Sequence, residues 1–420
     1  MSTGAAGRRR LTQGELEMIL SAHERFVTGK PGGKRASLRF VDLSGLDIIA
    51  RNLPDADFSG SSFDGARLVK TNFERANLFG CDLRGADLRA ANLRRADIRG
   101  ACLRGADLSM ADLTQADFRE GQIAIPHPKR GLDMIKHEAR NGEADKANFS
   151  GATLDGSNFN GVSAFAADFS DCSMRGTKLA GANLKDANLQ GAMLENADIA
   201  GCNLEGANLG GAVLTGANIA SAKIDKTNMA GAVTDPSAEA LGRADELKQR
   251  AASNQSWCET GAKTGSPANF DGEDLRPLKE QLKGAKLTAC SAKGACLVGI
   301  DLSGAHLQGA NFEGADLRGC NLRGADMRGA RLVGANLTKA DLRGAHLTPL
   351  PLGGGRSAPV ALNGSRMRYV HAQQADLTQA VFDEADLRGA DLTGARQNQA
   401  SWRGAHLNSV VGLNLEGEAA

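Results

Sequence analysis

The chain has 420 residues, and its 50 Lys and Arg residues nearly balance its 49 Asp and Glu residues, giving a formal net charge of +1. This balance argues against direct nucleic-acid binding, which generally needs a one-sided basic surface. Aromatic residues make up only 4% of the chain against 52 glycines, which excludes a conventional core built on bulky side chains.

The first predicted element is a helix within residues 11–29, LTQGELEMILSAHERFVTG. Thr12 and Glu15 have the spacing of a capping box, and Gly29 can end the helix. One face of the helix carries His23 together with apolar residues, which are Leu16, Ile19, Leu20, Phe26 and Val27. His23 is therefore expected to pack or to cap rather than to act as a base.

Large apolar residues then recur every five residues from Leu38 to Ile123. Neither a helix, with its period of 3.6, nor a strand, with its period of 2, fits this spacing. A small residue lies two positions before each large one, as Ala86 does before Leu88, and in extended chain both side chains then share one face. Gly often lies two positions after the large residue, where it suits a corner. Edges joined by corners describe a coil, and the fixed period indicates a solenoid.

The five-residue phase divides the chain into three arrays. The pattern restarts at Phe149 after a first break and near Leu287 after a second break. The third array is interrupted at 348–366 but keeps its phase. Because the phase slips only twice, and the second slip contains a cap-like segment, we expect two solenoid bodies, 36–232 and about 268–412.

The segments between the arrays differ from the repeats. Residues 125–145 are expected to carry one helical piece, and the Pro- and Gly-rich residues 347–365 predict a loop. HERFVTGKPGGKRASLRFVDL at 23–43 aligns with NQSWCETGAKTGSPANFDGEDL at 254–275, which suggests an internal duplication. A solenoid must cover the ends of its core, so both copies are interpreted as caps.

The repeats ADLRG, ANLQG, ANFEG and ADLTG resemble the A(D/N)LXX consensus of the pentapeptide repeat family. The resemblance extends over roughly three quarters of the chain. It implies an all-β fold, a right-handed quadrilateral β-helix with four repeats and about twenty residues per coil, here accompanied by short capping and linking helices.

Repeats and interruptions together predict seven segments. They are an N-terminal tail and capping helix (1–35), a solenoid (36–125), an interrupting loop or helix (126–146), a solenoid (147–232), a helical linker and second cap-like unit (233–267), a solenoid with a loop at 348–366 (268–412), and a C-terminal tail (413–420).

Histidines and aspartates often form catalytic or metal sites, and here most of them occur at fixed positions of the five-residue repeat. Four histidines occupy the outward position before the large residue: His306, His346, His371 and His406. His306 and His346 are two coils apart at twenty residues per coil, roughly 10 Å, which is too far to share a metal ion at about 2.1 Å per bond. The aspartates recur with the architecture and define no catalytic pair. No sequence motif of a hydrolase, metalloprotease or P-loop is present, so we expect no enzyme, metal or cofactor site.

Five of the eight cysteines fall on the small inward position: Cys81, Cys172, Cys202, Cys290 and Cys320. They are expected to be reduced core residues, and no CxxC pair points to zinc or redox chemistry. No signal peptide is recognisable, and no run of about eighteen apolar residues predicts a membrane span. These features favour the bacterial cytoplasm.

Two functions follow from these observations. The first is a non-enzymatic scaffold that presents polar solenoid faces to a protein partner. The second is implied by the resemblance, because some pentapeptide repeat proteins act on the bacterial type II topoisomerase DNA gyrase as acidic DNA mimics. Duplex DNA carries one negative charge per about 1.7 Å, whereas the most acidic array, 147–232, has 5 basic and 8 acidic residues, net −3. The arginines Arg84, Arg89, Arg94, Arg99 and Arg104 wind around the coil with acidic neighbours among them. The scaffold is therefore preferred.

Overall fold

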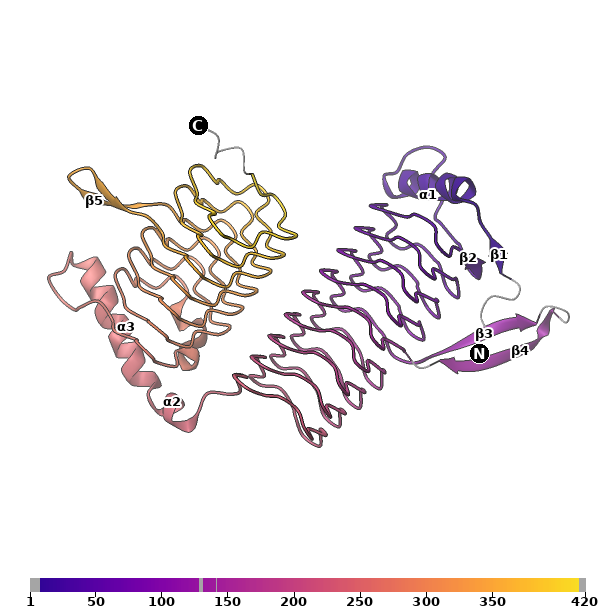
Figure 1. The fold of residues 1–420 in the computed structure, drawn as a ribbon, viewed down its shortest axis with the longest axis horizontal. Helices are drawn as coiled ribbons and strands as arrows, with labels where there is room; N and C mark the ends of the chain where they lie inside the picture. Colours follow the sequence, from indigo (N-terminus) through magenta and orange to yellow (C-terminus); the bar gives the residue numbers. More distant parts are fainter. Residues whose placement is uncertain (1–7, 128–130, 141, 415–420) are drawn as a thin grey trace. The chain divides into compact units, whose positions relative to one another are not determined.

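Each five-residue repeat forms a short extended edge, and each edge pairs in parallel with the edge of the next coil. Asp57 pairs with Asn77, Asn77 with Asp97 and Asp97 with Asp117, so one coil takes twenty residues and has four edges. The computed structural model describes residues 8–127, 131–140 and 142–414. It confirms the right-handed quadrilateral β-helix, and the stacked coils are visible in Figure 1.

The alternation of small and large residues builds the core, as the spacing predicts. Ala86 and Leu88 are both 0% exposed, while Asp87 between them faces outward and is half-buried. The corners need a left-handed backbone, which Gly85 adopts with φ +58° at no steric cost. Ala90 adopts the same conformation with φ +56°, so the coil imposes this corner even on residues that disfavour it.

The chain divides into two compact units, residues 1–235 and 236–420, each with its own apolar core. In unit 1, β1 (Arg9–Arg10) pairs in parallel with β2 (Val41–Asp42). Helix α1 (Gln13–Val27) begins with the predicted capping box and buries Leu16 and Leu20 against the first coil. It lies across the N-terminal end of this stack in Figure 1.

The helical piece expected in 125–145 is wrong. The segment is a β-hairpin of β3 (Gly121–His127) and β4 (Gly131–Arg140), with Gly121 opposite Arg140. A hairpin brings both of its ends back to the corner it left and pairs its own backbone groups, whereas one helix would end far from that corner. The coil continues past it, because Asp117 pairs with Asn158, 41 residues on, and one apolar core runs through both arrays.

The last coil of unit 1 differs from the coils before it. Ile219 and Ile224 occupy inward positions that are elsewhere buried, yet they are 40% and 47% exposed. Leu214, one edge earlier, is only 5% exposed. The apolar core of this unit therefore ends without a cap among the described residues.

Unit 2 begins with α2 (Ala238–Gly242) and α3 (Ala244–Glu259), and a 3₁₀ segment, η1 (Arg276–Leu282), interrupts its first coil. α3 covers that coil through the buried Leu247. The interruption at 348–366 is a short hairpin, β5 (Leu350–Gly353) and β6 (Arg356–Ala358), rather than an unpaired loop. The coil resumes behind it, with Arg331 paired to Ala361.

Candidate interaction surface

The histidines of unit 2 alternate with aspartates along the stack. His306 and His346 lie on one column two coils apart, as their spacing predicts, and Asp326 occupies the coil between them. Asp326 already accepts hydrogen bonds from Arg328 and from Gln308 Nε2 (2.6 Å). Within the described residues, no group of three or more His, Cys, Asp or Glu side chains is arranged to hold a metal ion.

The outward charges are paired inside single repeats. Arg89 Nε and Nη2 donate to the two carboxylate oxygens of Asp87 at 2.8 and 2.7 Å, and the Arg89 backbone N–H donates to the same side chain. The guanidinium hydrogen bond lowers the pKa of Asp87. Among the described residues nine repeats share this geometry; these Asp–x–Arg pairs are 82/84, 87/89, 97/99, 117/119, 274/276, 316/318, 326/328, 341/343 and 386/388.

This pairing was missed in the sequence, although its signal is present there. The sequence pattern predicts arginines that wind around the coil with acidic neighbours among them, without assigning a partner to each arginine. Two positions along an edge place both side chains on the same face, so Arg84 instead binds Asp82 of its own repeat at 2.5 Å. Arg104 binds Glu143, on the coil after the hairpin, at 3.0 Å.

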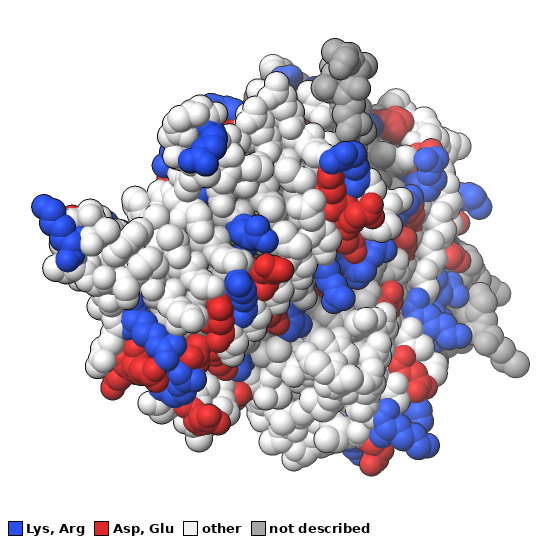
Figure 2. Space-filling view, turned by 60° about the vertical axis from the view of Figure 1, so that its left-hand side comes forward, with Lys and Arg blue, Asp and Glu red and all other residues white. Residues whose placement is uncertain are grey.

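Asparagine side chains form a second kind of array, along the stack. Asn72 Nδ2 donates to Asn52 Oδ1 at 2.7 Å, and Asn92 Nδ2 donates to Asn72 Oδ1 at 2.9 Å. Asn208 and Asn228 continue a similar ladder at 3.4 and 2.9 Å. These amides are fixed by each other rather than by solvent. On the face shown in Figure 2, basic and acidic side chains likewise lie next to one another in mixed clusters.

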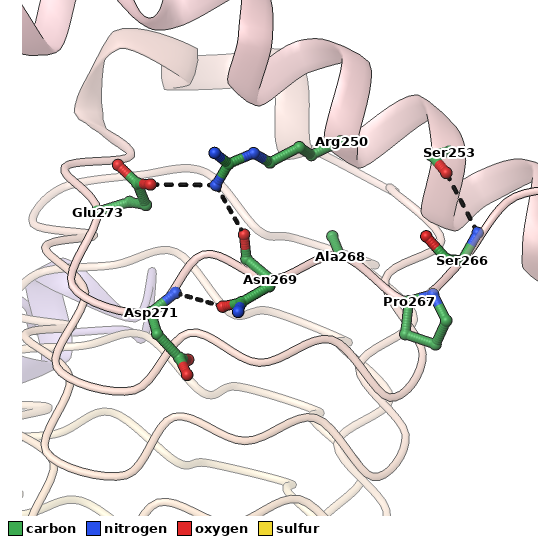
Figure 3. A pocket seen from close by; sticks show the side chains of 8 residues that line it. All are labelled: Arg250, Ser253, Ser266, Pro267, Ala268, Asn269, Asp271 and Glu273. Carbon is green, nitrogen blue, oxygen red and sulfur yellow. Dashed lines mark hydrogen bonds and ion pairs between the residues drawn. The ribbon is translucent and has the colours of Figure 1, made fainter.

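A polar hollow of about 460 Å³ lies between α3 and the first coil of unit 2 (Figure 3). Arg250 reaches across it from α3 and donates to Glu273 (3.0 Å) and to the Asn269 carbonyl (2.9 Å). Asp271 accepts a hydrogen bond from Ser291 Oγ at 2.5 Å, which lowers its pKa. Because its charged groups are already paired, this hollow is a joint between cap and coil rather than a ligand site.

The inward cysteines lie where the repeat places them. Cys81, Cys172, Cys202 and Cys320 each donate through Sγ to a carbonyl oxygen 23 residues earlier, at 2.8 to 3.1 Å. Burial raises the pKa of Cys81 to about 12. All eight cysteines are free thiols.

A family profile described as pentapeptide repeats matches the chain in eight overlapping copies, which together span 42–119, 167–233, 285–348 and 362–396, more than half of its length. The chain belongs to the pentapeptide repeat family. No curated protein matches this member of the family. No helix among its described residues is long and apolar enough to cross a membrane.

Solved structures of other pentapeptide repeat proteins align with the chain at low TM-scores. HetL, involved in heterocyst differentiation regulation in the cyanobacterium Nostoc sp. strain PCC 7120, is 21% identical over 94% of this chain and 97% of its own, with a TM-score of 0.21. Rfr23 from the cyanobacterium Cyanothece 51142 is 34% identical over 33% of this chain and 87% of its own, with a TM-score of 0.23. QnrB1, a plasmid-mediated fluoroquinolone resistance protein, is 18% identical over 51% of this chain and 96% of its own, with a TM-score of 0.23.

Proposed function

We propose that this pentapeptide repeat protein is a non-enzymatic scaffold whose solenoid faces bind protein partners. The Asp–x–Arg pairs carry this proposal. Each pair is held on a rigid edge by two guanidinium hydrogen bonds and, in Asp87 and its equivalents, by a backbone N–H. A partner that binds such a face does not have to order these side chains, which lowers the entropic cost of association.

The same pairs favour a protein partner over a nucleic acid. Binding to DNA draws its affinity from many cations that neutralise phosphates. Here Arg84, Arg89 and Arg99 are each neutralised by a carboxylate two residues away. Such a face offers a fixed pattern of dipoles and little net charge, which suits a protein surface of matching pattern.

The alternative is a DNA mimic that acts on DNA gyrase. It requires rows of uncompensated carboxylates, because duplex DNA carries one negative charge per about 1.7 Å. The aspartates that would supply such rows are bound to arginines in nine described repeats, so the charge pattern favours the scaffold.

We place this scaffold in a reducing compartment, the bacterial cytoplasm. Its support is the set of free thiols: the eight cysteines form no disulfide, and burial raises the pKa of Cys81 and of Cys202 to about 12. Disulfides are rare in such compartments.

The test is affinity capture from bacterial lysate with full-length protein and with pair-swapped variants. The double change Asp87→Arg with Arg89→Asp keeps the net charge and the ion pair but inverts the dipole; Asp316→Arg with Arg318→Asp does the same in unit 2. We expect the wild type to retain a bacterial protein even at about 0.5 M salt, where long-range charge attraction is screened. One of the two pair-swapped variants should lose this bound protein, while the other variant should keep it.

Gyrase supercoiling measured with the same samples separates the two functions. Inhibition or protection of gyrase that weakens steeply with salt would support the DNA mimic instead. Equal retention by wild type and both swaps would contradict recognition through the paired faces.

A further inference from the structure

The caps of the two units use the same bonding scheme with different residues. In unit 1, Nδ1 of His23 accepts a hydrogen bond from the backbone N–H of Ala36 (3.0 Å), and Nε2 bonds the carbonyl oxygen of Pro54 (3.0 Å). In unit 2, Oδ1 of Asn254 accepts from the N–H of Ala268 (2.9 Å), and Nδ2 donates to the carbonyl oxygen of Thr288 (3.1 Å). His23 and Asn254 also occupy the same place in the alignment of the two cap sequences.

Both side chains are 0% exposed, and each connects a cap helix to two backbone groups of the coil beneath it. A buried backbone N–H without a partner is costly, so the Ala36 and Ala268 amides depend on these side chains. We call His23 and Asn254 the cap latches.

His23 can serve as a latch in one protonation state only. Its Nδ1 must accept from Ala36 and its Nε2 must donate to Pro54, which defines the neutral Nε2–H tautomer. A protonated ring would direct an N–H from Nδ1 at the N–H of Ala36, lose that bond and bury a charge. Asn254 makes the equivalent bonds with an amide, which does not titrate.

The groups around His23 come from the helix and from the coil. Glu24 lies beside it on α1, Arg35 and Asp55 face it from the chain that enters and forms the first coil, and the Phe26 ring is 6.0 Å away. Burial, supported by Arg35, lowers the pKa of His23, and it outweighs the bond to Pro54 and the two carboxylates, which act in the opposite direction.

We propose that α1 is a proton-sensitive cap on unit 1, loosened when His23 is protonated, whereas the Asn254 cap of unit 2 stays latched over the same pH range. Loosening exposes part of the end of the apolar core, to which the buried Leu16 and Leu20 of α1 belong. The ion pairs of Arg51 with Glu17 and Glu24 still hold α1, so acid loosens the cap without detaching the helix.

The direction of the pH dependence follows from the bonding. A His whose pKa is lower in the folded state binds fewer protons there than in the open state, so the latch is strongest above the ordinary His pKa and weakens as the pH falls through the folded pKa. Between these two values the opening equilibrium gains up to one proton, which corresponds to up to about tenfold more opening per pH unit.

The experiment measures hydrogen exchange at the Ala36 and Ala268 amides of the full-length protein between pH 7.5 and 5, corrected for the intrinsic exchange rate at each pH. We expect protection at Ala36 to fall by up to about tenfold per unit below pH 6.5, while protection at Ala268 stays constant. In His23→Asn, Ala36 should become insensitive to pH; in Asn254→His, Ala268 should acquire the dependence.

Two results would overturn the proposal. One is an Ala36 protection factor that does not change with pH in the wild type. The other is a dependence that persists in His23→Asn, because it would then belong to neighbouring groups. If the Ala36 amide is unprotected at every pH in His23→Asn, the Asn254→His variant provides the test. The proposal is then refuted if protection at Ala268 in Asn254→His still does not change with pH.

Discussion

Leu93 and Asn92 are adjacent in the chain but lie in opposite surroundings. Leu93 is 1% exposed in the core, whereas Asn92 faces outward, donates to Asn72 and lies two residues before Arg94. Leu93→Asp buries an unpaired carboxylate and should cost more than about 4 kcal/mol of unfolding free energy. Asn92→Asp creates another Asp–x–Arg sequence and should shift Tm by only a few degrees.

Thermal unfolding of both variants checks this assignment. Similar losses at the two positions would mean that the inward and outward faces have been exchanged. The corresponding residues Leu322 and Asn321 provide an independent pair in unit 2, where Leu322 is 0% exposed.

The buried cysteines should be inert in the folded protein. Burial raises the pKa to about 12 for Cys81, Cys202 and Cys290, and to about 11 for Cys102, so the reactive thiolate is scarce at pH 8. We expect a thiol reagent to label the partly exposed Cys258 first and all eight cysteines only after denaturation. Cys81→Ala should change Tm by a few degrees at most, since Ala occupies this position in most repeats. Rapid native labelling of Cys81 would contradict its burial.

The spacing of the residues predicted their inward or outward position well, including the small inward position of Cys81. It did not predict what His23 binds. Both partners of His23 are main-chain atoms, the N–H of Ala36 and the carbonyl of Pro54, and every residue has such atoms, so the sequence carries no mark of them.

Single edges are stabilised by their ion pairs, and Asp386 takes part in two of them. It binds Arg388 in its own repeat at 2.7 Å and Arg368 of the preceding coil at 2.6 Å. Burial acts to raise the pKa of Asp386, but the two arginines outweigh burial and leave this pKa well below its ordinary value of 3.8.

Asp386→Asn should therefore reduce stability at pH 7 by about 1 kcal/mol. The unfolded chain binds more protons than the folded chain between the lowered pKa and 3.8, so the contribution of Asp386 is present above this range and is lost as the pH falls. Melting curves of variant and wild type should converge steadily below pH 3.8. A difference in Tm that is the same at pH 7 and at pH 2.5 would show that the carboxylate charge plays no part.

The hairpin β3–β4 is an insertion at a corner of the coil, so deleting it should leave the coil intact. Edges on its two sides pair 41 residues apart instead of 20, so 21 residues leave the coil. Deleting residues 121–141 should restore the five-residue phase from Phe118 to Ala144 and keep the Tm within a few degrees. Deleting 121–142 makes the corner one residue too short, so it should lower Tm strongly. Equal effects of both deletions would refute the insertion.

The sequence predicted where the interruptions lie but not their structure. A break in a five-residue period locates an insertion, and its length decides the change of phase, which is one residue for β3–β4 and none for β5–β6. Neither quantity distinguishes a helix from a hairpin. That choice depends on the distance between the two ends, which the closed corner of the coil sets.

At the scale of the whole molecule, the chain consists of two units with separate cores, 1–235 and 236–420. Each fragment should be expressed alone and melt cooperatively, because each contains its own cap helix. Limited proteolysis should separate them within 234–242, where the chain is largely exposed and includes Leu241 at 55% exposure. Cuts in the exposed 261–267 should leave α3 attached through Leu247 and Asn254. A chain that resists cleavage at 234–242, or a fragment that does not fold, would contradict independent units.

The phase slips predict two solenoid bodies, 36–232 and about 268–412, with 233–267 as a helical linker, whereas in the structure the second compact unit includes this linker from Pro236 onward. The helical linker expected within 233–267 is divided in the structure: Ser237 is the N-cap of α2, and the helix breaks at Arg243 before α3. Helix boundaries depend on such local caps, which the five-residue phase does not encode.

The position of each cap before its coils has a consequence for synthesis on the ribosome. α1 leaves the exit tunnel before the coils that follow it. Each later edge finds its partner in the coil formed twenty residues earlier, as Asn77 does when its N–H bonds the Ala56 carbonyl at 2.9 Å. Contacts of such short sequence separation form quickly and do not wait for the C-terminus. Unit 1 can therefore fold coil by coil during translation, with each completed coil pairing with the next one. The helix α3 then precedes a second stack of coils, which folds separately instead of extending the first stack.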